Sequence, residues 1–187
     1  CASRRMAEIE NKDLRYATRV EKEILENCKD LSVYSFGIAK HLARDGSKLT
    51  IYSDDELYKE VQGKNTKETI ENIERVLKNI EILCEDSHHW RFIKSGFENY
   101  RKALDSGSNI SFKYVPDLKE VVLQEKYKQP ILNLDMNSDM RNYFDLDPMM
   151  LSHGVLLLDI DDSNMSVFEP YEGNIRNLEK DKILNAL

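Results

Sequence analysis

The sequence has little of several residue types that define specialised classes of protein. Its three cysteines include no Cys-x-x-Cys pair, so neither a zinc site nor a disulfide framework is indicated, and a reducing compartment fits best. No apolar run approaches the about eighteen residues that cross a membrane, and we see no signal-peptide pattern. Basic residues are not in excess, since the formal net charge is −7. This balance argues against a nucleic-acid-binding protein.

What remains is the composition of a soluble globular protein. Hydrophobic residues make up 41% of the chain and charged residues 33%, and 187 residues suffice for a sizeable core. There are no internal repeats, low-complexity segments or obvious linkers. We therefore expect a single domain over residues 1–187, whose oligomeric state the sequence does not indicate.

Helical periodicity dominates the first hundred residues. It predicts an amphipathic helix over residues 2–27 and a second, buried helix over 33–45 that ends at Gly46. Residues 49–52 are either a short strand or an extended connection. Residues 54–104 are again predicted to be helical. Their clearest apolar stripe consists of Ile70, Ile73, Val76, Leu77, Ile80 and Leu83.

The character of the chain then changes from helices to strands. Residues 109–115 and 130–136 are predicted strands, separated by a helix that starts at Pro116 and runs to about Lys128. A polar loop through Asp147 follows. Helices first and a small antiparallel sheet last predict an α+β fold with two segregated halves.

The most informative stretch is residues 151–170. Two apolar runs flank a polar turn at residues 161–164, which is typical of a β-hairpin. His153 opens the first strand and Glu169 closes the second, so the hairpin brings both to the same end of the sheet. A short helix over residues 177–187 is expected to end the chain.

A histidine held by a carboxylate is the base half of a nucleophilic triad. The alternative is a structural hairpin in which His153 has no catalytic role and Glu169 is solvated. If the pair is catalytic, the nucleophile should lie at the N-terminus of a helix, where the dipole stabilises a thiolate or alkoxide. The helix predicted over 33–45 is the candidate, and it is preceded by Asn27-Cys28-Lys29-Asp30-Leu31-Ser32.

This order of elements resembles the papain-like cysteine proteases. The stretch from Ser152-His153 through Phe168-Glu169-Pro170 to Gly173 is similar to the end of the YopT/AvrPphB class of bacterial type III effector proteases. The resemblance covers about residues 27–46 and 130–175. It implies a papain-like fold with a helical insert at about 54–104, a protein or peptide substrate, no cofactor, and secretion into the cytoplasm of a host cell. Without the effector resemblance, a cytoplasmic protein is expected.

Carried over residue by residue, His153 matches the catalytic histidine and Glu169 matches the acid, as Glu where the family has Asp. Counting back fourteen residues from Gly46, as the family spacing requires, places Ser32 at the nucleophile. Asn27, five residues earlier, matches an oxyanion-stabilising amide. Cys28 is the alternative nucleophile if this alignment is shifted by one turn.

Serine at position 32 leaves three interpretations: an engineered Cys-to-Ser substitution, a natural serine variant or a catalytically inactive relative. The resemblance implies peptide-bond hydrolysis, and deamidation or acyl transfer would use the same triad. A non-catalytic protein-binding domain of the same fold is the alternative from another class. Cys1 could act as an N-terminal nucleophile, but such hydrolases need a strand-rich four-layer fold. Adjacent His88 and His89 would point to different faces of a helix and predict no metal site.

Overall fold

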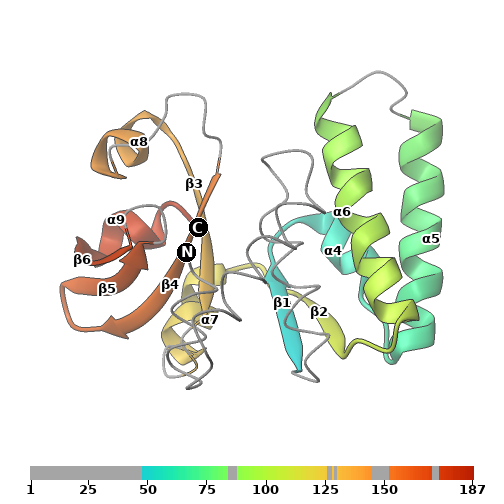
Figure 1. Cartoon of the computed structure of the whole chain (residues 1–187), viewed down its shortest axis with the longest axis horizontal. Coiled ribbons are helices and arrows are strands. Elements are labelled where there is room, and N and C mark those ends of the chain that lie inside the picture. Colours follow the sequence, from blue (N-terminus) through green and yellow to red (C-terminus); the bar gives the residue numbers. More distant parts are fainter. Residues whose placement is uncertain (1–47, 84–87, 126–127, 129, 145–151, 170–172) are drawn as a thin grey trace. The chain divides into compact units, whose positions relative to one another are not determined.

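The structure is a computed structural model of the whole chain, and it describes residues 48–83, 88–125, 128, 130–144, 152–169 and 173–187. Helices and strands are mixed in these residues, which confirms the predicted α+β class. The chain divides into two compact units. Their described residues lie within 48–116, called the helical unit, and within 117–187, called the sheet unit (Figure 1). The expectation of a single domain stays a prediction, as do the helices over 2–27 and 33–45, which lie outside the described residues.

Three helices and two strands form the helical unit, and they confirm that most of residues 54–104 is helical. In chain order they are β1 (Leu49–Ser53), α4 (Glu56–Val61), α5 (Thr66–Leu83), α6 (His88–Asp105) and β2 (Ile110–Tyr114). The long helices α5 and α6 lie side by side (Figure 1). Five residues of the stripe predicted on α5 belong to the core of this unit: Ile70, Ile73, Val76, Leu77 and Ile80. Ile73, Val76 and Ile80 of α5 share a core with Phe97, Tyr100 and Leu104 of α6 and with Ile110 and Phe112 of β2.

The strand predicted over 109–115 exists as β2, but its partner differs from the prediction. β2 pairs in parallel with β1, from Leu49 opposite Ile110 to Ser53 opposite Tyr114. It therefore does not belong to the antiparallel sheet that was expected to gather the later strands. Parallel pairing needs a long crossover, and α4, α5 and α6 supply it. Residues 49–52 are thus a strand.

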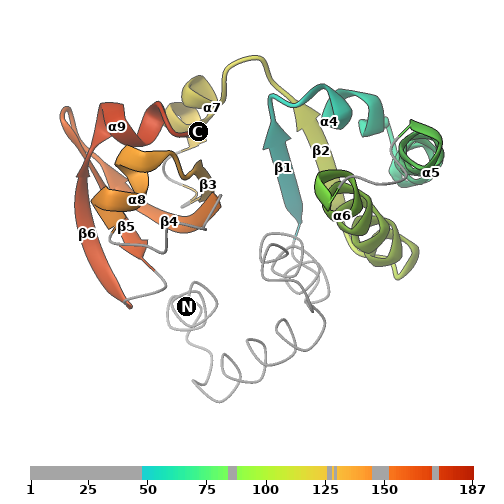
Figure 2. The ribbon, with the colours of Figure 1, turned by 90° about the horizontal axis from the view of Figure 1, so that it is seen from above.

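The sheet unit is a four-stranded antiparallel sheet in the order β3-β4-β5-β6. Its helices pack on one face of that sheet (Figure 2). The strands are β3 (Ile131–Asp135), β4 (Ser152–Ile160), β5 (Asn164–Glu169) and β6 (Asn174–Glu179), and the helices are α7 (Leu118–Glu125), α8 (Ser138–Phe144) and α9 (Lys180–Leu184). The predicted strand over 130–136 and the hairpin within 151–170 are both confirmed, as β3 and as β4 with β5.

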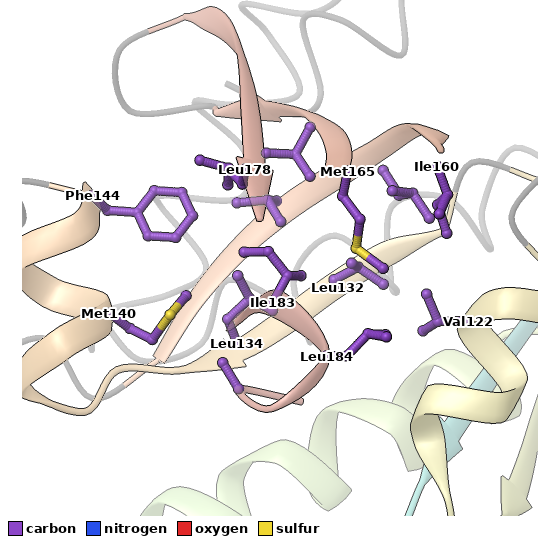
Figure 3. Packing of buried hydrophobic residues seen from close by; sticks show 14 of the residues in the cluster. Val122, Leu132, Leu134, Met140, Phe144, Ile160, Met165, Leu178, Ile183 and Leu184 are labelled. Atoms are coloured by element: carbon purple, nitrogen blue, oxygen red, sulfur yellow. The ribbon is translucent and has the colours of Figure 1, made fainter. Parts of the chain in front are cut away.

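The core of this unit lies between the sheet and its helices. Figure 3 shows Met140 and Phe144 reaching in from α8, and Ile183 and Leu184 from α9. The facing positions alternate along the strands, as one-sided burial of a sheet requires, except in β4, where the register shifts between Leu157 and Asp159. They include Leu132 and Leu134 of β3, Val155, Leu157 and Ile160 of β4, Met165 and Val167 of β5, and Leu178 of β6.

Two predicted helix boundaries in this unit are wrong. α7 begins at Leu118 rather than at Pro116, because the Asp117 carboxylate accepts the backbone N–H of Lys119 at 2.9 Å and forms a turn before the helix. The final helix was predicted over 177–187, but residues 177–179 belong to β6. Backbone pairing with β5, from Asn164 opposite Glu179 to Glu169 opposite Asn174, holds them extended.

The predicted polar loop through Asp147 is also wrong in part, since it contains α8. The Asn137 side chain accepts the backbone N–H of Met140 at 2.9 Å and so caps the helix. Met140 and Phe144 lie on one side of α8 and are buried in the core. None of the described helices is both long and apolar enough to pass through a membrane.

Candidate functional site

His153 is a buried side chain on the core-facing side of the sheet. It lies near the start of β4, opposite Leu134 of β3, and strand alternation places it on the same face as Val155 and Leu157. The residue is 8% exposed. A polar side chain at such a position needs a hydrogen-bond partner.

Glu169, the last residue of β5, is that partner. Its Oε1 lies 2.7 Å from Nε2 of His153, and the residue is only 1% exposed. Leu156 pairs with Phe168, so continuing the register by one residue sets Glu169 opposite Val155 and diagonal to His153. Diagonal neighbours on one face are farther apart than direct partners and are bridged by long side chains. The extra methylene of Glu over Asp suits this diagonal reach.

The hydrogen bond determines which imidazole nitrogen can act as a base. An ionised carboxylate only accepts hydrogen bonds, so Nε2 carries the proton in the neutral ring. Nδ1 is then the nitrogen with a free lone pair. No side chain or backbone group in the described part of the chain hydrogen-bonds to Nδ1. The arrangement leaves His153 as a neutral base in a defined tautomer.

Electrostatics keep this base neutral. Burial lowers the pKa of His153 from its ordinary value of 6.5, although the hydrogen bond and negative charge of Glu169 raise it. The positive charge of Arg176 lowers the pKa of His153 further. A neutral imidazole that can still gain a proton is what general-base catalysis requires.

Two side chains that the sequence analysis missed lie next to this pair. The Phe144 ring, at the end of α8, lies 5.3 Å from the His153 ring at an interplanar angle of 62°. The second side chain is Arg176 of β6. Its guanidinium carbon lies 5.8 Å from the centroid of the Phe144 ring. The apolar spacing of Met140 and Phe144 could have revealed the helix, but no local signal connects Arg176 to it.

Of the five site residues predicted from the sequence, the structure describes two. His153 and Glu169 are brought together, whereas Asn27, Cys28 and Ser32 lie outside the described residues. The turn at residues 161–164 is exposed and ordinary, with Asp161 Oδ1 accepting the backbone N–H groups of Ser163 and Asn164. Within the described ranges, no three His, Cys, Asp or Glu residues are grouped so that they could hold a metal ion.

A surface hollow in the helical unit offers no comparable chemistry. It lies between α5 and α6 and is lined by lysine, arginine and glutamate side chains with one leucine. Lys94 pairs there with Glu81, and Arg101 with Glu74 at 3.5 Å. These are exposed ion pairs on a solvated face, and such pairs contribute little.

Comparisons of the chain with models of known protein families, with curated proteins and with solved structures find no match.

Proposed function

We propose that His153 and Glu169 are the general base and the orienting carboxylate of a papain-like hydrolase that acts on a protein or peptide substrate. The observation that carries the proposal is the buried 2.7 Å hydrogen bond to Nε2, which leaves Nδ1 available as a base. Ser32 is the proposed nucleophile, with Cys28 as the alternative, and Asn27 is the proposed oxyanion donor.

The proposed mechanism has two half-reactions. The nucleophile attacks the scissile carbonyl carbon and gives its proton to Nδ1 of His153, while the Asn27 amide donates a hydrogen bond to the oxyanion. The Glu169 carboxylate stabilises the imidazolium. Collapse breaks the C–N bond, and the amine leaves with the proton from Nδ1. Water then attacks the acyl-enzyme by the same route and releases the acid and the free nucleophile.

The first half-reaction is common to three activities. Release of ammonia from a side-chain amide gives deamidation, and transfer of the acyl group to another acceptor gives acyl transfer. Hydrolysis of the peptide bond remains the proposed reaction, because the resemblance of residues 151–170 is to proteases. A non-catalytic protein-binding domain is the second candidate, and serine at position 32 favours it, because a hydroxyl is far less acidic than a thiol.

The proposal is tested by the pH profile of thiol alkylation in the S32C variant. Iodoacetamide labelling at each thiol is followed by site-resolved mass spectrometry between pH 5 and pH 7. An ordinary thiol with a pKa of about 8.5 reacts about a hundredfold faster at pH 7 than at pH 5, because only the thiolate reacts. A thiolate paired with imidazolium should react at a nearly constant rate. We expect this level profile at position 32, with Cys84 as the internal control.

Two further variants assign the effect to the pair. H153Q in the S32C background should restore the steep profile, since a glutamine side chain takes up no proton. E169Q keeps an oxygen acceptor for the Nε2 proton but loses the negative charge that stabilises the imidazolium. The pH range over which the alkylation rate at position 32 stays constant should therefore become narrower. A level profile at Cys28 in the unsubstituted chain would make Cys28 the nucleophile. Steep profiles at both positions would overturn the triad.

Hydrolysis is tested separately on a mixed peptide library. The S32C variant should generate new peptide N-termini, detected by mass spectrometry, and the same variant with H153Q should generate none. A level alkylation profile without cleavage would favour deamidation, acyl transfer or the binding domain over proteolysis.

A further inference from the structure

We infer that Arg176 is a positioning residue that holds the Phe144 ring against the His153 imidazole and keeps a positive charge close to that base. This inference rests on the proposed function for its catalytic meaning. The contacts involved are all among β4, β5, β6 and α8, so the inference can be tested without any substrate.

The strand register places three charged or polar side chains on one face of the sheet. Arg176 of β6 is opposite Val167 of β5, and Val167 is two residues from Glu169 on the same face. His153 of β4 continues the row on the other side of Glu169. The three side chains therefore follow one another across adjacent strands, all on the face that α8 covers.

Arg176 fixes the end of α8 through its guanidinium group. Its Nη1 donates a hydrogen bond to the main-chain carbonyl of Tyr143 at 3.1 Å. That carbonyl belongs to the last turn of α8, where backbone acceptors have no partner within the helix. A cation is also favourable at this end of the helix dipole. Arg176 thus ties the last turn of a seven-residue helix to β6.

Phe144 connects Arg176 to His153, because its ring contacts both side chains. Its ring is near both groups: the guanidinium carbon is 5.8 Å from the ring centroid, and the imidazole is 5.3 Å away centroid to centroid. The residue is 1% exposed, and its neighbour Met140 packs in the same core (Figure 3). An aromatic ring held in this way restricts rotation of the imidazole and keeps water from that side of it.

Arg176 and Glu169 also act on His153 in opposite senses. Among the described residues, the charged groups that act on the imidazole are Glu169 on β5 and Arg176 on β6. The packed neighbours from the other elements, Phe144 on α8 and Leu134 on β3, are uncharged. Glu169 favours the imidazolium, and Arg176 favours the neutral ring that a general base needs before the reaction.

The test uses nuclear magnetic resonance of the full chain in three variants. R176Q removes the charge and retains a donor, R176K retains the charge and removes the planar fork, and K182Q is the matched control. Lys182 also lies over an α8 ring, but a different one: its Nζ is 4.8 Å from the Tyr143 centroid, and it pairs with Glu179. The readouts are the pKa of His153 from its ring shifts and the nuclear Overhauser effect between the Phe144 and His153 rings.

We expect R176Q to shift the pKa of His153 upward and to weaken the ring-to-ring Overhauser effect. R176K should leave the pKa near that of the unsubstituted protein and still weaken the ring contact. K182Q should change neither. An unchanged pKa and an unchanged ring contact in R176Q would overturn the inference. If R176Q does not fold, an unchanged ring contact in R176K overturns it.

These outcomes are separate from the test of the proposed function. A shifted pKa in R176Q with steep alkylation profiles in S32C would leave Arg176 as a positioning residue for a structural histidine and would remove the triad. Level profiles in S32C with no response to R176Q would retain the triad and remove the role of Arg176.

Discussion

His153 and Glu169 form a hydrogen-bonded polar pair at positions where a sheet core normally holds apolar side chains. Their exposures are 8% and 1%, and Val155, Leu157 and Val167 on the same face are apolar. Replacing a buried polar pair by well-packed apolar residues is often neutral or stabilising. Stability therefore gives little reason for this pair, whereas a base with an available Nδ1 gives a chemical one.

The protonation of His153 predicts a specific dependence of stability on pH. Burial lowers the pKa of His153 in the folded protein below the ordinary value of 6.5, so the unfolded chain binds a proton more readily. The stability of the neutral, buried ring is fully present above pH 6.5. It is lost as the pH falls from 6.5 towards the pKa of the folded state, by up to about 1.4 kcal/mol per pH unit.

Urea unfolding at pH 7.5 and pH 5.5 measures this loss. The free energy of unfolding of the unsubstituted protein should fall more between these pH values than that of H153Q, whose side chain does not titrate. Carboxylates elsewhere affect both proteins alike and cancel in the difference. Equal losses in the two proteins would show that His153 titrates as it does in an unfolded chain.

At the scale of elements, two glycines differ in how closely neighbouring atoms approach them. Gly63 joins α4 to α5, and a Cβ built there would lie 2.5 Å from the backbone nitrogen of Thr69 and 2.7 Å from its Oγ1. Gly154 in β4, beside His153, has no atom within 4 Å of such a Cβ and does not adopt a positive φ. The first glycine is required by close packing and the second is not.

We therefore predict opposite outcomes for the same substitution at these two positions. G63A should lower the free energy of unfolding by about 1–3 kcal/mol, because the α5 backbone must move to admit the methyl group. G154A should change it by no more than about 0.5 kcal/mol, because alanine suits an extended strand at least as well as glycine. Thermal or urea unfolding measures the free energy of unfolding of the two variants. A G63A variant as stable as G154A would contradict the prediction.

At the scale of the whole molecule, the described residues form two cores that share no side chain. One core belongs to residues 48–116 and includes Ile73, and the other belongs to residues 117–187 and surrounds the His153–Glu169 pair. Separate cores permit separate unfolding of each unit. The His153–Glu169 pair should then depend mainly on the integrity of the sheet unit.

This organisation is tested with two isoleucines of α5. Ile73 is fully buried and Ile82 is 78% exposed. I73A should lower the stability of the helical unit by about 2–5 kcal/mol, whereas I82A should change it by about 0.5 kcal/mol or less. Amide hydrogen exchange should show the loss within residues 48–116 while residues 117–187 keep their protection. An equal loss in both units would show that they unfold together.

Local patterns predicted the elements whose residues carry their own signal. The alternation and polar turn within residues 151–170 predicted β4 and β5, and the apolar stripe of α5 predicted its buried face. β6 has a polar sequence with few apolar residues, and it is extended because β5 supplies its backbone partners. α8 has only seven residues. A helix of that length is stable only through its cap and its packing.

The sequence by itself determined that His153 and Glu169 meet, because a hairpin is a local structure and the two residues are only sixteen positions apart in the chain. The tertiary structure alone decided that the pair is buried, which imidazole nitrogen faces the carboxylate, and that Phe144 and Arg176 flank it. Those features depend on contacts among α8, β4, β5 and β6, whose residues are far apart in the chain. Neither strand alternation nor helical spacing encodes such contacts, because both describe only neighbours within one element.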